Sequence, residues 1–221
     1  VLDLKSISKT FNAGTVNEKT ALNNLCLHLN DGDFVTVIGG NGAGKSTMLN
    51  AVAGVWPVDE GTIEIGGVNV TKLPEYKRAK YLGRVFQDPM MGTAPTMMIE
   101  ENLALAARRG QRRGLKWGIT PLERADYKEL LRTLDLGLED RLTSKVGLLS
   151  GGQRQALTLL MATLVTPKLL LLDEITANLD AETERAVLRA LKRATADRTV
   201  LSISHRVGAD TGRLIPIGEE S

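Results

Sequence analysis

The stretch "GGNGAGKST", residues 39–47, combines closely spaced glycines with a lysine and two hydroxyl side chains. It follows the apolar run "FVTVI" and precedes a helical pattern. Glycines let successive backbone N–H groups point at a phosphate, and a helix N-terminus adds its positive dipole end. Lys45 would neutralise the β and γ phosphates, and the Ser46 hydroxyl would ligate Mg²⁺. The predicted phosphate-binding residues are Gly39, Gly40, Asn41, Gly42, Ala43, Gly44, Lys45, Ser46 and Thr47.

Two adjacent acids, Asp173 and Glu174, end the apolar run "KLLLLDE". A buried strand would deliver Asp173 to its C-terminal end, where a carboxylate holds the hydration shell of Mg²⁺. Glu174 can point toward an attacking water as a general base, a role that contributes roughly 10²–10⁴-fold to rate. The chain carries no N-K-x-D segment of the kind that reads guanine. The pattern therefore favours ATP over GTP.

A second glycine-rich helix start lies at "LLSGGQRQALTLL", residues 148–160. Ser150 can cap a helix, and Gly151 and Gly152 let the backbone approach an anion closely. The first glycine-rich loop, residues 39–47, would already surround the triphosphate from one side. We therefore expect the second to act on the opposite face of a nucleotide held by another copy.

"LSGGQ", placed after the G-x-x-x-x-G-K-S-T stretch and before "LLLLDE", resembles the signature of the ATP-binding-cassette (ABC) family. The resemblance covers essentially the whole chain. It implies an ATPase that forms a head-to-tail dimer around two ATP molecules. In that dimer the residues expected to contact ATP in trans are Ser150, Gly151, Gly152, Gln153 and Asp180.

The same resemblance assigns roles to single residues. Gln87 in "RVFQDP" matches the glutamine that contacts Mg²⁺ and the attacking water, so the implied metal set is Ser46, Gln87 and Asp173. His205 in "SISHR" matches the histidine that contacts the γ-phosphate. Phe11 fits the aromatic residue that stacks on adenine, although core packing is an alternative role for it. The implied catalytic residues are Lys45, Gln87, Glu174 and His205.

Hydrophobic periodicity predicts the elements that position these residues. Period-two alternation in residues 2–7, 25–29 and 63–65 indicates half-buried antiparallel strands. Nearly continuous apolar runs at 34–39, 168–174 and 199–204 indicate central parallel strands covered on both faces. Helical patterns cover residues 45–55, 100–109, 121–136, 150–165 and 181–196.

These elements predict an α/β fold: a P-loop NTPase core with a mainly parallel sheet, an N-terminal antiparallel β subdomain and an inserted helical subdomain. All 221 residues would form one ATPase domain. Residues 1–89 and 149–221 would make the core and β subdomain, and residues 90–148 the helical subdomain.

Composition limits the partners. The formal net charge is only +2, so nucleic acid is not expected as the main partner. Basic residues concentrate in "RRGQRRGLK", residues 108–116, which is either a solvated face or a contact with a membrane partner or lipid headgroups. The longest apolar stretch is too short to span a membrane. The single cysteine, Cys26, excludes an internal disulfide, and we expect it to be a small core residue in a reducing cytoplasm.

The leading hypothesis is a subunit that powers solute transport through ATP-driven dimerisation. We expect it at the inner face of the cell membrane, paired with permease subunits and in some systems a solute-binding protein. The strand-like N-terminus argues against a secretory leader. One alternative is a soluble cassette acting on ribosomes or DNA. Such versions carry two cassettes or long coiled coils, which are not evident here.

Another alternative is an inactive or engineered domain, against which the retained Lys45 and Glu174 argue. The region through Glu174 resembles importer ATPases, whereas the region after it is more similar to exporters, which suggests a recombined chain. Ile175 departs from the family pattern, in which proline is usual after the catalytic glutamate. "LLM" at residues 159–161 also departs from it, and both leave details of the dimer interface open.

Overall fold

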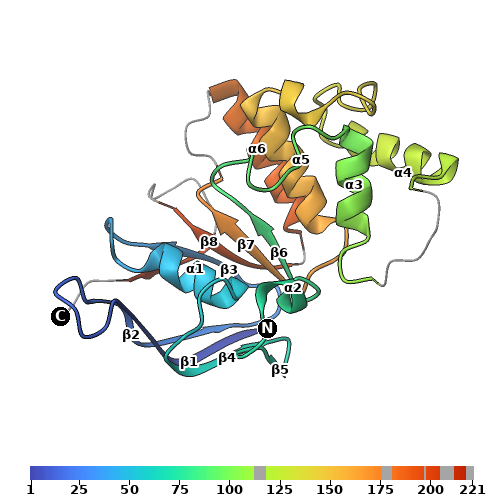
Figure 1. Ribbon diagram of the computed structural model, residues 1–221. Coiled ribbons are helices and arrows are strands. Elements are labelled where there is room, and N and C mark those ends of the chain that lie inside the picture. Colours follow the sequence, from blue (N-terminus) through green and yellow to red (C-terminus); the bar gives the residue numbers. More distant parts are fainter. Residues whose placement is uncertain (112–117, 176–180, 197, 205–211, 218–221) are drawn as a thin grey trace. The chain divides into compact units, whose positions relative to one another are not determined.

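The computed structural model describes residues 1–111, 118–175, 181–196, 198–204 and 212–217 (Figure 1). Contacts group the chain into two compact units. Unit 1 comprises residues 1–84, 167–174 and 197–221, and unit 2 comprises residues 85–166 and 175–196. The predicted division into residues 1–89 with 149–221 and an inserted subdomain of residues 90–148 stays a prediction.

Unit 1 contains an antiparallel sheet of strand order β2-β1-β4-β5. The strands are β1 (Leu2–Phe11), β2 (Lys19–Leu29), β4 (Glu60–Ile65) and β5 (Val68–Asn69). Leu2, Leu29 and Ile65 on its inner face are fully buried. Alternation of buried and exposed positions along β1 and β2 produces this one-sided sheet, as the sequence pattern predicts.

Cys26 corrects one expectation. It is exposed rather than part of the core, because it lies on the opposite face of β2 from Leu27 and Leu29. Its sulfur accepts a hydrogen bond from the Ser6 backbone amide across the sheet at 3.2 Å. Cys26 projects to the same face of β2 as the exposed His28. The residue type alone does not predict which face a cysteine occupies.

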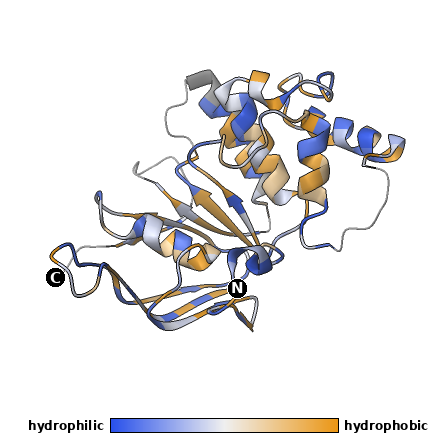
Figure 2. Ribbon diagram, viewed as in Figure 1, coloured by the Kyte–Doolittle hydropathy of each residue, from blue (hydrophilic) through white to orange (hydrophobic). Residues whose placement is uncertain are grey.

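The second sheet of unit 1 has the strand order β6-β7-β8-β3-β9. Its strands are β6 (Leu82–Val85), β7 (Leu169–Asp173), β8 (Thr199–Ile203), β3 (Phe34–Ile38) and β9 (Arg213–Pro216). β7, β8, β3 and β9 run parallel. Figure 2 shows the hydrophobic character of β7, whose four leucines are all buried. The parallel arrangement brings the residues after β3 and those after β7 to the same edge of the sheet.

Helix α1 (Lys45–Ala53) follows β3, and the short helix α2 (Glu75–Arg78) precedes β6. Arg78 is 2% exposed and donates four hydrogen bonds to main-chain carbonyls. Two of them reach Ala51 and Val52 at the C-terminal end of α1, at 2.7 and 2.9 Å. The guanidinium thus satisfies carbonyls that a helix end leaves without partners.

Unit 2 is helical. Its helices are α3 (Ile99–Ala107), α4 (Pro121–Arg132), the 3₁₀ turn η1 (Val146–Leu148), α5 (Gly151–Thr163) and α6 (Ala181–Ala194). Thr120 caps α4 through a reciprocal capping box with Glu123. Figure 2 shows both hydrophilic and hydrophobic residues along α4, as expected for an amphipathic helix. None of the described helices combines the length and apolar character needed to cross a bilayer.

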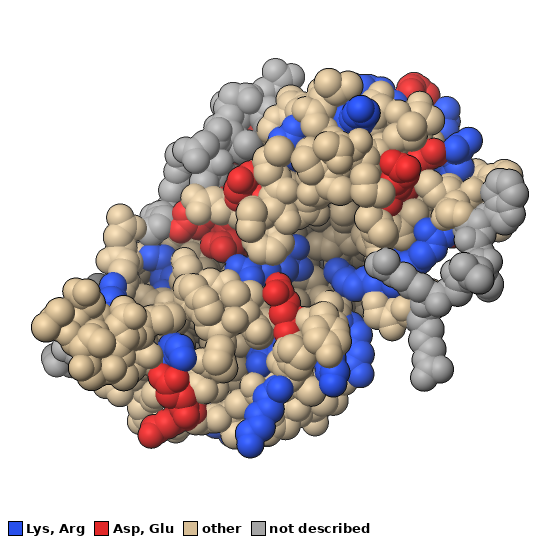
Figure 3. All heavy atoms as spheres, viewed as in Figure 1, with Lys and Arg blue, Asp and Glu red and all other residues tan. Residues whose placement is uncertain are grey.

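Figure 3 shows basic and acidic side chains interspersed on the face that it draws, in line with the small net charge. The basic stretch at residues 108–116 is described only through Gln111; residues 112–117 lie outside the described part of the chain.

Candidate functional site

The phosphate-loop residues form the connection between β3 and α1. Gly44 occupies the N-cap position of α1, and among the described residues no side chain caps this helix. The first N–H groups of a helix have no partner within the helix. Here the helix start is therefore free to donate to an anion, and the dipole of α1 adds to that attraction.

Two of the glycines are required by the backbone of this loop. Gly42 and Gly44 have φ values of 84° and 90°, in the left-handed region. A Cβ on Gly44 would also lie 2.3 Å from the Ala21 carbonyl oxygen of β2. Gly39 has a different constraint, because a Cβ there would lie 2.4 Å from the carbonyl oxygen of Ile217. The loop shape thus depends on glycine at these positions.

Lys45 lies across the loop rather than in solvent. Its Nζ donates hydrogen bonds to the carbonyls of Gly39 and Gly40, at 2.6 and 2.8 Å, and the residue is 5% exposed. Ser46 at the start of α1 is exposed, and its hydroxyl is of a type that ligates Mg²⁺. The ammonium and the hydroxyl therefore flank the free end of the helix.

A pocket of about 250 Å³ opens beside this loop. Its lining residues are Phe11, Lys19, Ala21, Asn41, Gly42, Ala43, Gly44, Lys45, Ser46 and Thr47. Phe11 therefore lies with the phosphate loop. Its ring packs edge-on against Trp56, with centroids 5.0 Å apart and planes at 79°. An aromatic ring at the border of a pocket is of a type that can stack on a nucleotide base.

Asp173, at the end of β7, lies in a partly buried charged cluster. Its Oδ2 is 3.7 Å from an Arg84 nitrogen, and the side chains are 17% and 10% exposed. The same guanidinium donates to Oδ1 of Asn50 on α1 at 2.8 Å. Burial raises the pKa of the Asp173 carboxyl, and the neighbouring Arg84 acts in the opposite direction. A hard cation such as Mg²⁺ would satisfy a carboxylate in this environment.

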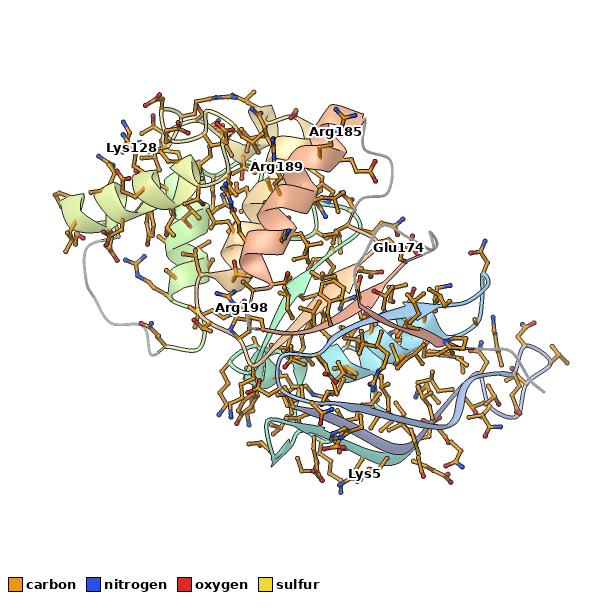
Figure 4. The ribbon with its side chains drawn as sticks, turned by 180° about the vertical axis from the view of Figure 1, so that it is seen from behind. Lys5, Lys128, Glu174, Arg185, Arg189 and Arg198 are labelled. Atoms are coloured by element: carbon orange, nitrogen blue, oxygen red, sulfur yellow. The ribbon has the colours of Figure 1, made fainter. Side chains whose placement is uncertain are left out.

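Glu174 has a strained backbone. Its φ of 44° is in the left-handed region, which costs a non-glycine residue about 1–3 kcal/mol and is typical of functional sites. Its amide donates to the Ile203 carbonyl of β8 at 3.2 Å. Glu174 directly follows β7, and Figure 4 shows it at the end of that strand. The Glu174 side chain is half-buried.

The signature residues begin helix α5 in unit 2. The Ser150 hydroxyl accepts a hydrogen bond from the Gln153 amide at 3.3 Å, and Gln153 Oε1 accepts one from the Ser150 amide at 3.2 Å. Ser150 and Gly151 are exposed, whereas Gly152 is buried. A Cβ on Gly151 would meet no described atom within 4 Å. Packing within the described part of the chain therefore does not require glycine at this position.

Arg154 supports this helix start. Its guanidinium donates to the carbonyls of Val146, Gly147 and Leu149 in the preceding turn, at 3.1 to 3.4 Å. These bonds fix the turn that leads into Ser150.

Of the remaining predicted site residues, the structure describes only Gln87. Gln87 is exposed and lies two residues after the end of β6, in unit 2. Asp180 and His205 lie outside the described residues. In unit 1 the structure thus brings Phe11 together with the phosphate loop, while Ser150, Gly151, Gly152 and Gln153 are grouped in unit 2.

Three residues that sequence reasoning missed belong to these sites. Lys19 lines the pocket, Arg84 contacts Asp173, and Arg154 supports the signature turn. Arg154 directly follows the signature, which was a usable signal. Lys19 and Arg84 are distant in sequence from the groups that they approach, so only the folded chain reveals them.

Comparison with known proteins identifies the class of this site. The family model described as "ABC transporter" matches residues 22–177. The chain belongs to this family. It is an ATP-binding and ATP-hydrolysing subunit, as the resemblance of "LSGGQ" and the phosphate loop implies.

Two curated relatives are similar over most of the chain. A tyrosine transport ATP-binding protein from Clostridioides difficile is 40% identical over 209 residues, which cover 94% of this chain and 83% of that protein. The spermidine/putrescine import ATP-binding protein PotA from Haemophilus influenzae is 33% identical over 87% of this chain. The chain spans about half of PotA's length, at 47%.

Solved structures match the fold. A dimeric structure of the ATP-binding cassette MJ0796, in a post-hydrolysis state with ADP and Pi, has a TM-score of 0.83 and 29% identity. The match covers 99% of this chain and 94% of the other. The predicted fold class is confirmed. Because one relative matches 94% of the chain across residue 174, the comparisons lend no support to the recombination hypothesis.

Proposed function

We propose that ATP binds in the pocket of unit 1 and is closed by the signature residues of a second copy. The uncapped start of α1, with Lys45 over the loop, carries this proposal. Ser150, Gly151, Gly152, Gln153 and Asp180 of the second copy would complete the site. The relative MJ0796 forms a dimer, which supports the arrangement.

In this proposal each residue of the chain has a distinct task. The amides of the loop and Lys45 bind and orient the phosphates, and Phe11 stacks on adenine. Ser46, Gln87 and Asp173 would hold Mg²⁺, which when bound neutralises charge on the transferring phosphoryl group. Glu174 accepts a proton from the attacking water, and His205 contacts the γ-phosphate. Closing the dimer excludes water from the site.

A Glu174→Gln variant tests the assignment of the base. The amide keeps the size of the side chain but cannot take a proton, so hydrolysis should fall by at least about 10²-fold. With ATP and Mg²⁺ the variant should accumulate as a dimer, measured by light scattering after size exclusion. A Lys45→Ala control should neither bind ATP nor dimerise. Undiminished phosphate release by the Glu174→Gln variant would refute the role of Glu174.

We further propose that the work of this cycle drives an integral membrane permease at the inner face of the membrane. The 40% identity to a tyrosine transport ATP-binding protein favours an amino-acid-like solute. The similarity to a spermidine/putrescine import ATP-binding protein favours import, for which a solute-binding protein would be an additional partner. Affinity purification from detergent-solubilised membranes of the source cell should recover an integral membrane protein. Recovery of ribosomes or DNA instead would favour the soluble-cassette alternative.

A further inference from the structure

Lys19 lies on the same face of the antiparallel sheet as Phe11. The two residues are direct partners in the β1–β2 register, and residues directly opposite each other project to one face of a sheet. Both line the pocket beside the phosphate loop. The base-stacking ring and the Lys19 ammonium therefore border the same cavity.

The backbone of β2 is held against the phosphate loop just beyond Lys19. The Ala21 carbonyl oxygen lies 2.3 Å, and Leu22 Cδ2 3.2 Å, from where a Cβ of Gly44 would stand. Lys19 Nζ itself lies 3.4 Å from the corresponding position at Gly42. The close packing of β2 fixes the start of the Lys19 side chain, so its ammonium remains within reach of the loop.

The charge of Lys19 is not neutralised within the described part of the chain. Two other lysines of the same sheet have acidic partners there: Lys5 lies 3.3 Å from Glu64, and Lys9 lies 2.8 Å from Asp59. No described carboxylate forms an ion pair with Lys19, although it is exposed at the edge of the pocket. An unpaired cation beside a helix start that attracts anions favours a polyanionic ligand.

We infer that Lys19 is a second phosphate-binding cation of the nucleotide pocket, acting from β2, whereas Lys45 acts from the start of α1. This inference rests on the proposed function of the pocket. Lys19 strengthens binding of nucleotides in proportion to their phosphate charge and contributes little to recognition of the base. It is thus a determinant of affinity for nucleoside polyphosphates.

Equilibrium binding of a fluorescent ATP analogue to the full chain tests this role. Lys19→Gln should weaken binding by roughly 3- to 10-fold at low salt, because one charge contact in a partly solvated site is lost. The dependence of affinity on salt should become shallower in this variant, since fewer charges are screened. Lys19→Arg should restore both the affinity and its dependence on salt. Lys5→Gln is the matched control: it removes one charge from the same sheet, and Lys5 lies outside the pocket (Figure 4).

Competition with ATP, ADP and adenosine distinguishes phosphate binding from a general disturbance of the pocket. Lys19→Gln should weaken competition by ATP most and by adenosine least. An equal loss for all three ligands, or an unchanged affinity for ATP, would overturn the inference. If the unaltered chain binds no ATP at all, the proposed function itself fails, which is a separate and recognisable result.

Discussion

At the residue scale, replacing Arg84 tests whether its charge pairing with Asp173 stabilises the fold. In Arg84→Gln the Asp173 carboxylate keeps its partial burial but loses its nearby cation, which should destabilise unit 1 by about 2–4 kcal/mol. Urea unfolding measures this loss. Arg185→Gln, on the exposed side of α6, should stay within about 0.5 kcal/mol. The double variant Arg84→Gln/Asp173→Asn should lose clearly less than the two single losses added together; simple additivity would show that the pair does not interact.

The strained backbone of Glu174 gives a second residue-scale prediction. Glycine adopts a φ of 44° without a Cβ penalty, so Glu174→Gly should be about 1 kcal/mol more stable than Glu174→Ala. Both variants lack the carboxylate and should be equally inactive. Comparing their thermal midpoints isolates the backbone effect. An alanine variant at least as stable as the glycine variant would contradict stored strain at this position.

At the scale of elements, Arg78 joins α2 to the end of α1. Replacing it with methionine keeps the apolar stem but leaves buried carbonyls without donors, so Arg78→Met should cost about 3 kcal/mol in urea unfolding. Arg78→Lys should rescue only a fraction of this loss, because one ammonium cannot reproduce the planar fork. Lys77→Met, one position away and exposed, serves as the control. Full rescue by lysine would show that charge rather than geometry matters.

The pairing of β1 with β2 should depend on pH through Asp3 and His28. Their side chains are 2.5 Å apart; the hydrogen bond raises the pKa of His28 above 6.5 and lowers that of Asp3 below 3.8. His28 stabilises the fold below its unfolded value and loses this effect as pH rises through its folded pKa. Asp3 stabilises the fold above its unfolded pKa and loses this effect as pH falls through its folded pKa. The pair therefore contributes most between about pH 4 and 6.5.

Asp3→Asn tests this window. Thermal midpoints of the variant and the unaltered chain should differ most at about pH 5.5 and converge above about pH 8.5. The effect should be small, because His28 is exposed and Asp3 is only half-buried. A difference that persisted unchanged at alkaline pH would assign the effect to something other than the ion pair.

The elements were largely predictable from sequence because each carries a local pattern. The apolar run after Lys168 and the periodicity of residues 150–165 depend only on neighbouring residues, and they appear as β7 and α5. Predicted helix ends were too long by one to four residues, as for residues 121–136 against α4. Helix ends depend on capping and on packing, which periodicity does not encode.

Side-chain partners were not predictable in the same way. Nothing local distinguishes Lys19 from Lys5, or Arg84 from an ordinary strand residue, because both acquire their roles from β2, α1 and β7 meeting in space. The phosphate-loop residues and the signature are different. Their chemistry is carried by consecutive residues, so the motif and the site coincide in sequence.

At the scale of the whole molecule, ATP should stabilise the fold. Ligand at about 100 times its dissociation constant contributes about 2.7 kcal/mol, which corresponds to a rise in Tm of roughly 5–10 °C for a chain of this size. Differential scanning fluorimetry with and without ATP and Mg²⁺ measures it. Lys45→Ala should abolish the shift. An equal shift in that variant would place the binding site elsewhere.

The edge-on contact between Phe11 and Trp56 makes the pocket optically observable without a label. An adenine ring arriving on Phe11 would alter the polarity and electronic surroundings of the adjoining indole, so its emission should change in step with occupancy. Trp117, the other tryptophan, lies outside the described residues and can be replaced by phenylalanine to leave a single emitter. The emission of Trp56 would then follow the binding and release of ATP in real time.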